Sequence, residues 1–310
     1  MKTLILKLNA TGDVLRTTPL LRCIAGHVTW ITAARNVPLL EGLQDTLTCL
    51  PWEDRALALD DTYDLLVNLE DEVEVSQFAA EVDAARRFGA FLGTAGTVRY
   101  TPDSRGWFDL SLISTHGREA ADRLKLLNRR TYQDLIFEGL GHTFEDQRYM
   151  LPATAHRGLS GDVAIAPLSG PVWPMKSWDH YAELQRRLES SGLTVNVLPT
   201  RNSLLEHIAD VRGHRCLVSG DSLPMHIALG AGIPCVTIFN CTSPWEIHDY
   251  GLQTKIVSPL LCEFFYQRGL DPRATTAVSL DDVHEAVMNA LAMEAPRERD
   301  RPLPASAQMP

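Results

Sequence analysis

The stretch LILKLNATGDVLRTTPLLR, residues 4–22, decides how the first half of the chain folds. Its opening belongs to the run TLILKL, residues 3–8, which is apolar at nearly every position, as is typical of a central strand covered on both faces. From Val14 onward the apolar residues recur at helical spacing. A buried strand that leads through a Gly-Asp turn into a helix predicts a parallel sheet with crossover helices.

The same alternation continues along the chain. Apolar runs that predict strands occupy residues 28–32, 63–69, 163–167, 193–198, 216–219 and 235–239. In the second half, helical patterns separate them over residues 177–192, 202–212 and 224–232. The sequence therefore predicts an α/β protein built from doubly wound parallel sheets.

One stretch interrupts this pattern and divides the chain. LPATAHRGLSGD, residues 151–162, is rich in Pro, Gly, Ser and Ala and lacks periodicity, which predicts a linker. We therefore expect two domains, residues 1–155 and 156–293, that face each other across a cleft. Residues 294–310 are rich in proline and charge and have almost nothing to bury, so a disordered tail is expected there.

Composition narrows the class of protein. The net charge of -10 and the pI near 5.5 argue against a nucleic-acid-binding protein, which would normally present a basic face. No run reaches the roughly 18 apolar residues of a membrane-spanning helix, and the apolar start is too short for a signal peptide. The six cysteines show neither a CxxC nor a zinc-ligand spacing, which gives disulfides and structural zinc little support. We expect a cytoplasmic protein.

Ligands of open α/β sheets collect at the carboxyl ends of the strands. Three loops of the chain are expected there, namely NATGD (9–13), APLSGPVWPMK (166–176) and SGDSLPMH (219–226). Neither GxGxxG nor GxxxxGK[ST] occurs in the sequence, so a nicotinamide-dependent enzyme is disfavoured and a P-loop is absent.

In the last of these loops a strand ends and a helix must begin. Asp221 and Ser222 stand at the expected helix start, Pro224 suits a first turn, and His226 falls one turn inside. Free backbone N–H groups and the positive end of the helix dipole would then face a ligand, which favours a diphosphate. The alternative is a well-capped helix whose histidine satisfies a buried backbone carbonyl.

Lys176 ends the middle loop, directly before the helix expected from Ser177. A cation there opposes the helix dipole unless an anion offsets it, and a bound phosphate would be such an anion. Ser177 and Asp179 supply polar groups for the helix start. The alternative is a solvated lysine on a surface loop.

Asp13 has two interpretations. It suits a helix cap, but a carboxylate on a turn that faces a cleft can also act as a general base. Because Pro19 removes an internal hydrogen bond, we expect the helix to break and to restart with Thr18 as its cap. That break would leave Asp13 freer to face a substrate, and we favour the catalytic interpretation.

These three segments, in this order, resemble glycosyltransferase family 9, the heptosyltransferases. Residues 4–22 are similar to the family's opening strand, small-residue loop and Gly-Asp pair, and APLSGPVWPMKSWDHYAEL (166–184) to its donor-domain segment. SGDSLPMHIALGAGIPCVTIFNCTSP (219–244) is similar to its most specific motif. The resemblance implies a GT-B fold with an N-terminal acceptor domain and a C-terminal nucleotide-sugar domain. It also implies inverting transfer of a heptose from a nucleotide diphosphate, with ADP-heptose as the expected donor in lipopolysaccharide biosynthesis, without a metal or cofactor.

The resemblance also implies roles for single residues. Asp13 matches the base that deprotonates the acceptor hydroxyl, and Lys176 matches a lysine that binds the donor diphosphate. The residues expected to bind the donor are Thr11, Gly12, Ser169, Lys176, Asp221, Ser222 and His226.

Two departures from the family pattern keep other functions open. Leu223 stands where the family usually has glycine, and the donor domain looks one strand-helix unit short after residue 198. No residue is therefore assigned to the adenine or the ribose. A nucleotide-sugar-binding protein without turnover and a nucleotide-sugar epimerase are the alternatives.

The acceptor cannot be identified from the sequence and could be a glycan, a glycolipid or a small molecule. Residues 106–141 predict a mobile loop and a helix pair with aromatic and basic side chains, namely Trp107, Phe108, Arg118, Lys125, Arg129 and Arg130. These side chains would suit an anionic, lipid-linked acceptor and a peripheral membrane contact. A solvated helix face is the simpler explanation, and we prefer it.

Overall fold

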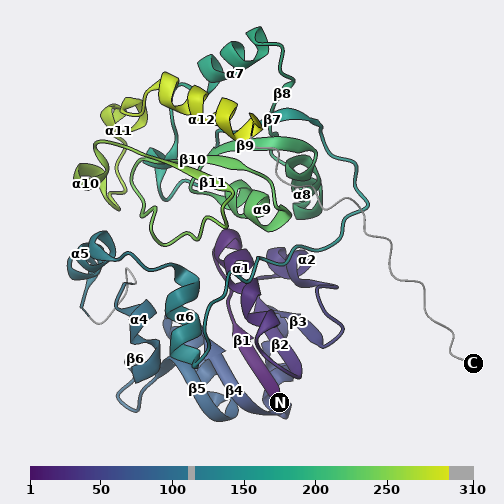
Figure 1. Cartoon of the computed structure of the whole chain (residues 1–310). Coiled ribbons are helices and arrows are strands. Elements are labelled where there is room, and N and C mark those ends of the chain that lie inside the picture. Colours follow the sequence, from purple (N-terminus) through teal and green to yellow (C-terminus); the bar gives the residue numbers. More distant parts are fainter. Residues whose placement is uncertain (111–115, 293–310) are drawn as a thin grey trace, which may run out of the picture.

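The computed structural model describes residues 1–110 and 116–292 and contains two α/β units, one from each half of the chain (Figure 1). The N-terminal unit holds a six-stranded sheet and the C-terminal unit a five-stranded sheet. The predicted class, two parallel-sheet α/β domains, is confirmed. The tail expected at residues 294–310 lies outside the described residues.

The N-terminal sheet has the strand order β3-β2-β1-β4-β5-β6, and only β6 runs antiparallel to its neighbour. Its strands are β1 (Lys2–Leu6), β2 (His27–Thr32), β3 (Leu47–Pro51), β4 (Thr62–Asn68), β5 (Asp83–Leu92) and β6 (Val98–Tyr100). Leu4 and Ile5 of β1 are fully buried and belong to different apolar clusters, one on each face of the sheet. β1 is therefore the doubly covered central strand that its sequence predicts.

The C-terminal sheet is parallel throughout, in the order β11-β10-β9-β7-β8. Its strands are β7 (Gly161–Ala166), β8 (Val195–Val197), β9 (His214–Gly220), β10 (Cys235–Phe239) and β11 (Gln253–Val257). The chain between residues 142 and 160 forms neither helix nor strand, and the last two residues of the predicted linker already belong to β7.

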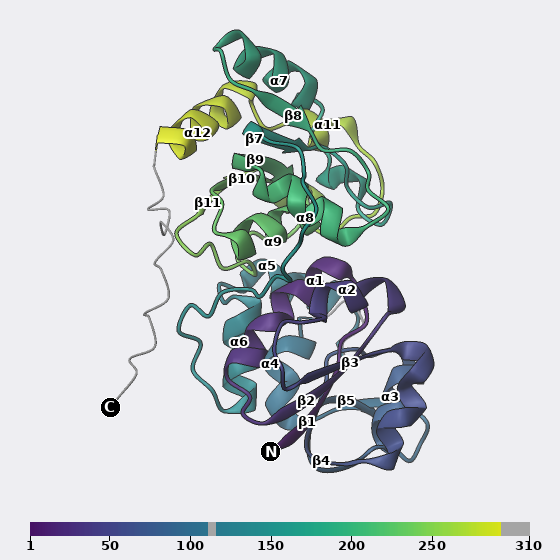
Figure 2. The same ribbon diagram turned by 90° about the vertical axis from the view of Figure 1, so that its right-hand side faces the viewer.

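Helices cover both sheets (Figures 1 and 2). In the N-terminal unit they are α1 (Thr11–Thr17), α2 (Val37–Leu40), α3 (Val73–Glu81), α4 (Arg105–Phe108), α5 (Arg118–Leu127) and α6 (Tyr132–Leu140). In the C-terminal unit they are α7 (Tyr181–Ser190), α8 (Leu204–Arg212), α9 (Leu223–Ala231), α10 (Leu261–Phe264), α11 (Pro272–Thr276) and α12 (Leu280–Ala292). Short 3₁₀ helices are η1 (Thr18–Arg22), η2 (Ala34–Asn36), η3 (Trp52–Asp60), η4 (Pro102–Ser104) and η5 (Pro174–Lys176).

The opening helix corrects two details of the sequence analysis. Ala10, not Asp13, is the N-cap residue of α1, and Asp13 lies inside the first turn. The chain does change to a 3₁₀ helix at Thr18, but Thr18 does not cap it. The Thr18 hydroxyl instead donates to the Leu15 carbonyl at 2.7 Å and accepts from the Met150 amide at 2.8 Å. The Thr18 hydroxyl, which the local sequence predicted to cap a helix, is therefore used in a tertiary contact with the segment around Met150.

The two units share buried apolar surface. One cluster of buried side chains contains Leu15 of α1 and Met225 and Leu229 of α9, together with Tyr149 from the segment that connects the units. Both views of the ribbon place α1 directly beside α9 at the junction (Figures 1 and 2). Burial of such surface is favourable, so it holds the carboxyl end of β1 against the C-terminal unit.

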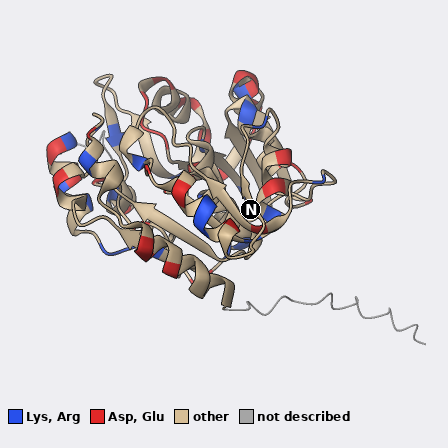
Figure 3. Ribbon diagram, turned by 90° about the horizontal axis from the view of Figure 1, so that it is seen from above, with Lys and Arg blue, Asp and Glu red and all other residues tan. Residues whose placement is uncertain are grey.

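The described residues carry intermixed charges, unpaired cysteines and no helix that could cross a membrane. Acidic and basic residues are intermixed along the helices in the view from above (Figure 3). All six cysteines are unpaired, and three of them are buried. Among residues 1–110 and 116–292, no helix is long and apolar enough to cross a membrane.

Candidate active site

Asp13 lies in the first turn of α1, directly after the loop that follows β1. Its side chain is 36% exposed, and its Oδ1 lies 3.1 Å from Nε of Arg16, one turn along the helix. Burial works to raise the pKa of Asp13, but Arg16, Lys7 and other nearby cations outweigh it and hold the pKa below its ordinary value. Asp13 is therefore ionised at neutral pH, as a general base must be.

Arg16 is a charged group at this site that the sequence analysis missed. Its buried guanidinium carbon lies 4.3 Å from the ring centroid of Tyr132 and 5.3 Å from that of Trp107. Stacking of this kind contributes roughly 0.5–2 kcal/mol. The Tyr132 hydroxyl lies 2.7 Å from that of Thr17, which donates to the Asp13 carbonyl. The spacing of Asp13 and Arg16 at i and i+3 was the available sequence signal.

A buried carboxylate fixes the loop before α1. Glu70 Oε1 accepts hydrogen bonds from the Leu8 amide at 2.6 Å, the Asn9 amide at 2.9 Å and Lys7 Nζ at 2.9 Å. Burial alone would lower the pKa of Lys7, but the carboxylates of Glu70 and Asp13 raise it above its ordinary value. Lys7, which looks in the sequence like an interruption of an apolar strand, thus supplies a second cation near Asp13.

The late motif lies at the carboxyl end of β9, where α9 begins. As predicted, Ser222 is the N-cap residue, Pro224 lies in the first turn and His226 follows one turn inside. The Ser222 hydroxyl does not cap the helix but donates to the Gly220 carbonyl at 3.4 Å. Pro224 has no N–H and the Met225 N–H donates to the Ser222 carbonyl at 3.1 Å, which leaves the Leu223 N–H free within the helix, at the positive end of its dipole.

His226 is buried, with 4% of its surface exposed. Burial lowers the pKa of His226 to about 4, although Asp221 acts in the opposite direction, so the ring is neutral at pH 7. Its Nδ1 has no hydrogen-bond partner within the described residues. The alternative, in which the histidine donates to a buried backbone carbonyl, is therefore not supported at Nδ1.

Lys176 binds Asp221, the residue before the N-cap of α9. Its Nζ donates to the Asp221 carbonyl at 2.8 Å and lies 2.9 Å from Asp221 Oδ2. Burial opposes ionisation of Asp221, but Lys176 and His226 hold its pKa at about 2. The Lys176 side chain is only 18% exposed, so the alternative of a solvated surface lysine is wrong.

The helix after Lys176 begins later than predicted. Lys176 ends the 3₁₀ helix η5, and α7 starts only at Tyr181. Ser177 and Asp179 do not cap it, because His180 is its N-cap residue and both earlier residues contact distant segments. The Ser177 carbonyl accepts from the side chain of Asn240 at 2.7 Å, and the Asp179 carboxylate accepts from the hydroxyl of Thr275 at 2.9 Å.

Gly12 brings the two halves of the site together. A Cβ atom added to Gly12 would lie 2.9 Å from Cδ2 and 3.4 Å from Nε2 of His226. Residues with a side chain do not fit this approach without a shift of α1 or α9. The neighbouring Asp13 is consequently held near the start of α9, where the charge of Lys176 acts on it and His226 acts on it only when protonated.

Two further predicted residues lie in the flanking loops. Thr11 is the first residue of α1, and its hydroxyl donates to Asn36 Oδ1 at 2.8 Å. Asn36 is buried and donates in turn to the Leu8 carbonyl at 2.6 Å, so this pair supports the loop before Asp13. Ser169 is half-buried in the loop between β7 and η5.

Two basic residues of the region 106–141 contact the other unit of the chain. Lys125 of α5 is 6% exposed, lies 3.8 Å from Glu246 Oε1 and stands 4.4 Å from the ring centroid of Tyr266. Arg129 stacks on Trp245 at 3.7 Å. Both side chains contact the C-terminal unit, but the expected solvated helix face is wrong only for Lys125, because Arg129 stays exposed.

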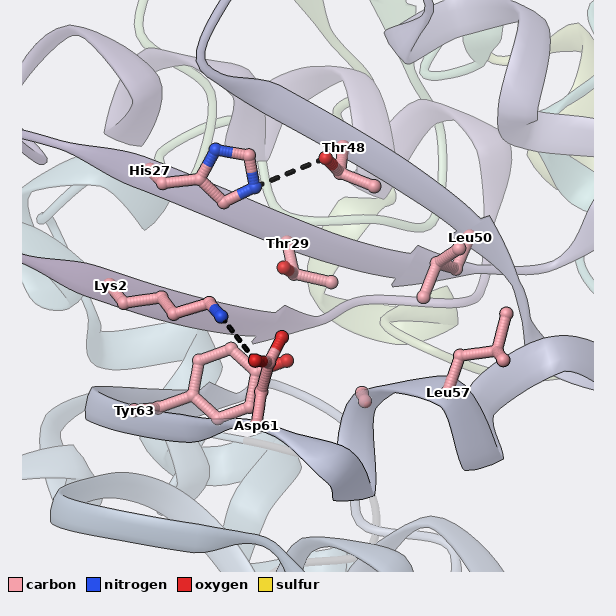
Figure 4. Close-up of a pocket in the computed structure, with 9 residues that line it drawn as sticks. Lys2, His27, Thr29, Thr48, Leu50, Leu57, Asp61 and Tyr63 are labelled. Carbon is pink, nitrogen blue, oxygen red and sulfur yellow. Dashed lines mark hydrogen bonds and ion pairs between the residues drawn. The ribbon is translucent and has the colours of Figure 1, made fainter.

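A separate cavity of about 610 Å³ lies in the N-terminal unit, between residues that include Lys2, His27, Asp61 and Tyr63 (Figure 4). Lys2 and His27 begin β1 and β2, so this cavity lies at the amino ends of the strands. It is distinct from the Asp13 site, which follows the carboxyl end of β1. Within the described residues, no group of three or more His, Cys, Asp or Glu side chains could hold a metal ion.

Residues 181–263 match the sequence model of glycosyltransferase family 9 (heptosyltransferase). This segment contains Asp221, Ser222 and His226. No curated protein matches the chain in sequence.

Solved structures resemble the whole chain. The E. coli heptosyltransferase WaaC, solved with ADP, has a TM-score of 0.60 and 16% identity over 94% of this chain and 100% of that one. A glycosyltransferase of family 9 from Veillonella parvula has a TM-score of 0.63 and 16% identity over 94% of this chain and 97% of that one. The E. coli ADP-heptose lipopolysaccharide heptosyltransferase II has a TM-score of 0.59 and 15% identity, covering 95% of this chain and 99% of that one.

At these identities the structural likeness shows the fold, and the sequence match to the family is confined to residues 181–263. The GT-B arrangement of two parallel-sheet domains is confirmed. The family model and the shared fold together confirm the predicted resemblance to glycosyltransferase family 9, and they support the enzyme class that it predicts, a glycosyltransferase.

Proposed function

We propose that the protein transfers a heptose from ADP-heptose to an acceptor hydroxyl with inversion at the anomeric carbon. Asp13 is the general base, and Lys176 with the start of α9 binds the donor diphosphate. In this proposal residues 1–155 bind the acceptor and residues 156–293 the donor, and no metal or cofactor takes part. The observation that carries the proposal is the contact of Gly12 with His226, which holds Asp13 beside the start of α9.

The chemistry follows from the charges of these residues. The Asp13 carboxylate takes the proton of the acceptor hydroxyl as its oxygen forms a bond to the anomeric carbon. The bond from that carbon to the diphosphate oxygen breaks, and ADP leaves with the electron pair. Lys176 and the Leu223 N–H at the positive end of the α9 dipole stabilise the negative charge on the leaving group.

Similar proteins support ADP-heptose as the donor. The E. coli WaaC structure contains ADP, and a second structure of it contains ADP-2-deoxy-2-fluoro heptose. In this chain Lys176 is already paired with the Asp221 carboxylate, so a diphosphate must compete with that carboxylate for the ammonium group. The acceptor is a glycan, a glycolipid or a small molecule. A lipid-linked acceptor would bring this cytoplasmic protein to the inner face of the membrane.

Calorimetric titration with ADP tests the donor site. We expect ADP to bind to the native protein. Lys176→Met should weaken the affinity for ADP by about tenfold or more, because hydrogen bonds to charged groups are worth about 1.5–3 kcal/mol. Lys2→Met is the matched control and should leave the Kd for ADP unchanged. Lys2 begins β1, whereas the Asp13 site follows the other end of that strand. An equal Kd for the native protein and Lys176→Met would contradict the assigned diphosphate site.

Turnover separates the proposal from its alternatives. The native protein should release ADP from ADP-heptose faster when an acceptor is present. ADP binding without turnover across glycan, glycolipid and small-molecule acceptors would favour a nucleotide-sugar-binding protein. Conversion of the free sugar nucleotide into its epimer, without an acceptor, would identify an epimerase.

A further inference from the structure

Arg16 stands out because a buried cation rarely lies against a catalytic carboxylate without being hydrogen-bonded to it. The Arg16 side chain is 9% exposed, and its Nε lies 3.1 Å from Asp13 Oδ1. This buried Nε nevertheless has no hydrogen-bond partner in the described part of the chain, so the contact is an ion pair of poor hydrogen-bond alignment. Among the described residues, no other N–H or O–H group donates to the Asp13 carboxylate.

Two rings hold the guanidinium in place. Tyr132 of α6 and Trp107 of α4 lie 4.3 and 5.3 Å from it, and the two rings meet edge to face at 4.7 Å. Gln133, next to Tyr132, donates to the Arg16 carbonyl at 2.9 Å. Side chains more than 90 positions away in the sequence therefore fix Arg16, and Asp13 alone does not.

We propose that Arg16 is a positioning residue for the base: clamped by Trp107 and Tyr132, it holds a positive charge at a fixed place beside the Asp13 carboxylate and leaves the carboxylate oxygens free to accept the proton of the acceptor hydroxyl. This inference rests on the proposed function, in which Asp13 is that base. A carboxylate bound by well-aligned N–H donors would be a poorer proton acceptor, because those hydrogen bonds favour its charged form.

Other charges also act on Asp13 and must be separated from Arg16. Lys7 directly follows β1 and Lys176 ends η5, whereas His226 on α9 carries a charge only below its pKa of about 4. Tyr132 also faces Asp13, but its pKa is raised by burial, so its hydroxyl is neutral. Arg16 itself faces Glu246 and Tyr149 besides Asp13 and Tyr132.

A carboxyl titration by NMR tests the inference without any turnover. The full chain is labelled with ¹³C-aspartate, and the Asp13 signal is assigned by its loss in Asp13→Asn. We expect Arg16→Gln to raise the pKa of Asp13 by about one unit, a tenfold change in proton affinity, with a smaller rise in Arg16→Lys. Trp107→Leu or Tyr132→Leu should also raise the pKa of Asp13, because the Arg16 guanidinium keeps its charge but is no longer held beside the carboxylate.

Arg55→Gln is the matched control. Arg55 stacks on Trp52 at 4.3 Å and lies 3.2 Å from the carboxylate of Glu74, also in the N-terminal unit. It should leave the Asp13 titration unchanged. A folded Arg16→Gln protein whose Asp13 titrates as in the native protein would overturn the inference.

Kinetics then distinguish this inference from the proposed function. In Arg16→Gln the acid limb of the kcat profile should move to higher pH by about one unit, while the KM for ADP-heptose stays within twofold. An unchanged profile in an active enzyme would overturn the role of Arg16 and leave the glycosyltransferase intact. A native protein without turnover would instead overturn the proposed function, and the titration would still decide whether Arg16 controls Asp13.

Discussion

Gly12 of α1 lies so close to His226 of α9 that a Cβ atom on Gly12 would come within 2.9 Å of the imidazole Cδ2. This relationship joins the first turn of α1, in the N-terminal unit, to the helix that begins directly after Asp221 and Ser222. It explains why a glycine precedes Asp13, since the conformation of Gly12 itself is an ordinary helical one.

Gly12→Ala should therefore destabilise the protein and slow transfer. Alanine favours a helix over glycine by up to about 1 kcal/mol, but the overlap with His226 should cost roughly 1–3 kcal/mol. Denaturant unfolding measures the balance. Gly106→Ala in α4 is the control, because its Cβ would meet only Leu135 at an ordinary 3.7 Å, and it should be neutral or stabilising. The stability lost in Gly12→Ala should be partly restored when His226→Ala is added, because the overlap with the imidazole is then removed. No restoration would show that this overlap does not cause the loss.

The buried His226 should make stability depend on pH. Its pKa is about 4 in the folded protein against an ordinary 6.5, so the unfolded state binds more protons between these values. The free energy of unfolding should then fall as the pH is lowered from about 6.5 to 4. His226→Gln should flatten this part of the curve by a few kcal/mol, since one pKa unit corresponds to about 1.4 kcal/mol.

Unfolding in urea at a series of pH values checks this expectation. Asp221, with a pKa of about 2, stays ionised throughout the window and does not confuse the result. If His226→Gln shifted stability by the same amount at pH 5 and pH 7.5, the histidine would not be the buried neutral group described here.

Lys125 should stabilise the contact between the two units. Its Nζ is 3.8 Å from Glu246 Oε1, both side chains are buried, and the Tyr132 amide donates to the Glu246 carbonyl at 2.9 Å. Lys125→Met leaves Glu246 buried without its cation, which typically costs about 3–5 kcal/mol.

The neighbouring Arg123→Met is the matched control. Arg123 lies on the same helix and pairs with Glu119, but both side chains are exposed, so the loss should stay below about 1 kcal/mol. The free energies of unfolding of the two variants are compared. Equal losses would mean that Lys125 is not an interdomain anchor.

Local sequence patterns predicted the elements that carry the site. The run from Thr3 to Leu8 predicted a doubly covered strand, and the Asp221–His226 pattern predicted a helix start after a strand; both are confirmed. These features depend on neighbours in the sequence, and Pro224 and Gly220 signal the helix start directly. The pairing of strands within the sheets has no such local sequence signal.

The missed and misplaced residues all have partners far along the chain. Arg16 is held by Trp107 and Tyr132, and Asp179 accepts from Thr275 instead of capping a helix. Lys125, which looks like part of a solvated helix, is buried because the turn after β10 lies against it. Propensity and charge pattern could not reveal these contacts, because they form between elements that only tertiary packing brings together, within one unit for Arg16 and Asp179 and between the two units for Lys125.

Single-turnover release of ADP from ADP-heptose by Asp13→Asn tests the central claim most directly. The assay uses saturating donor and the acceptor that supports the fastest transfer by the native protein, and calorimetry with ADP confirms that the donor site is intact. Loss of the base should slow transfer by about 10²–10⁴-fold while the Kd for ADP stays unchanged. Transfer by Asp13→Asn at the native rate would contradict the assignment of Asp13 as the base.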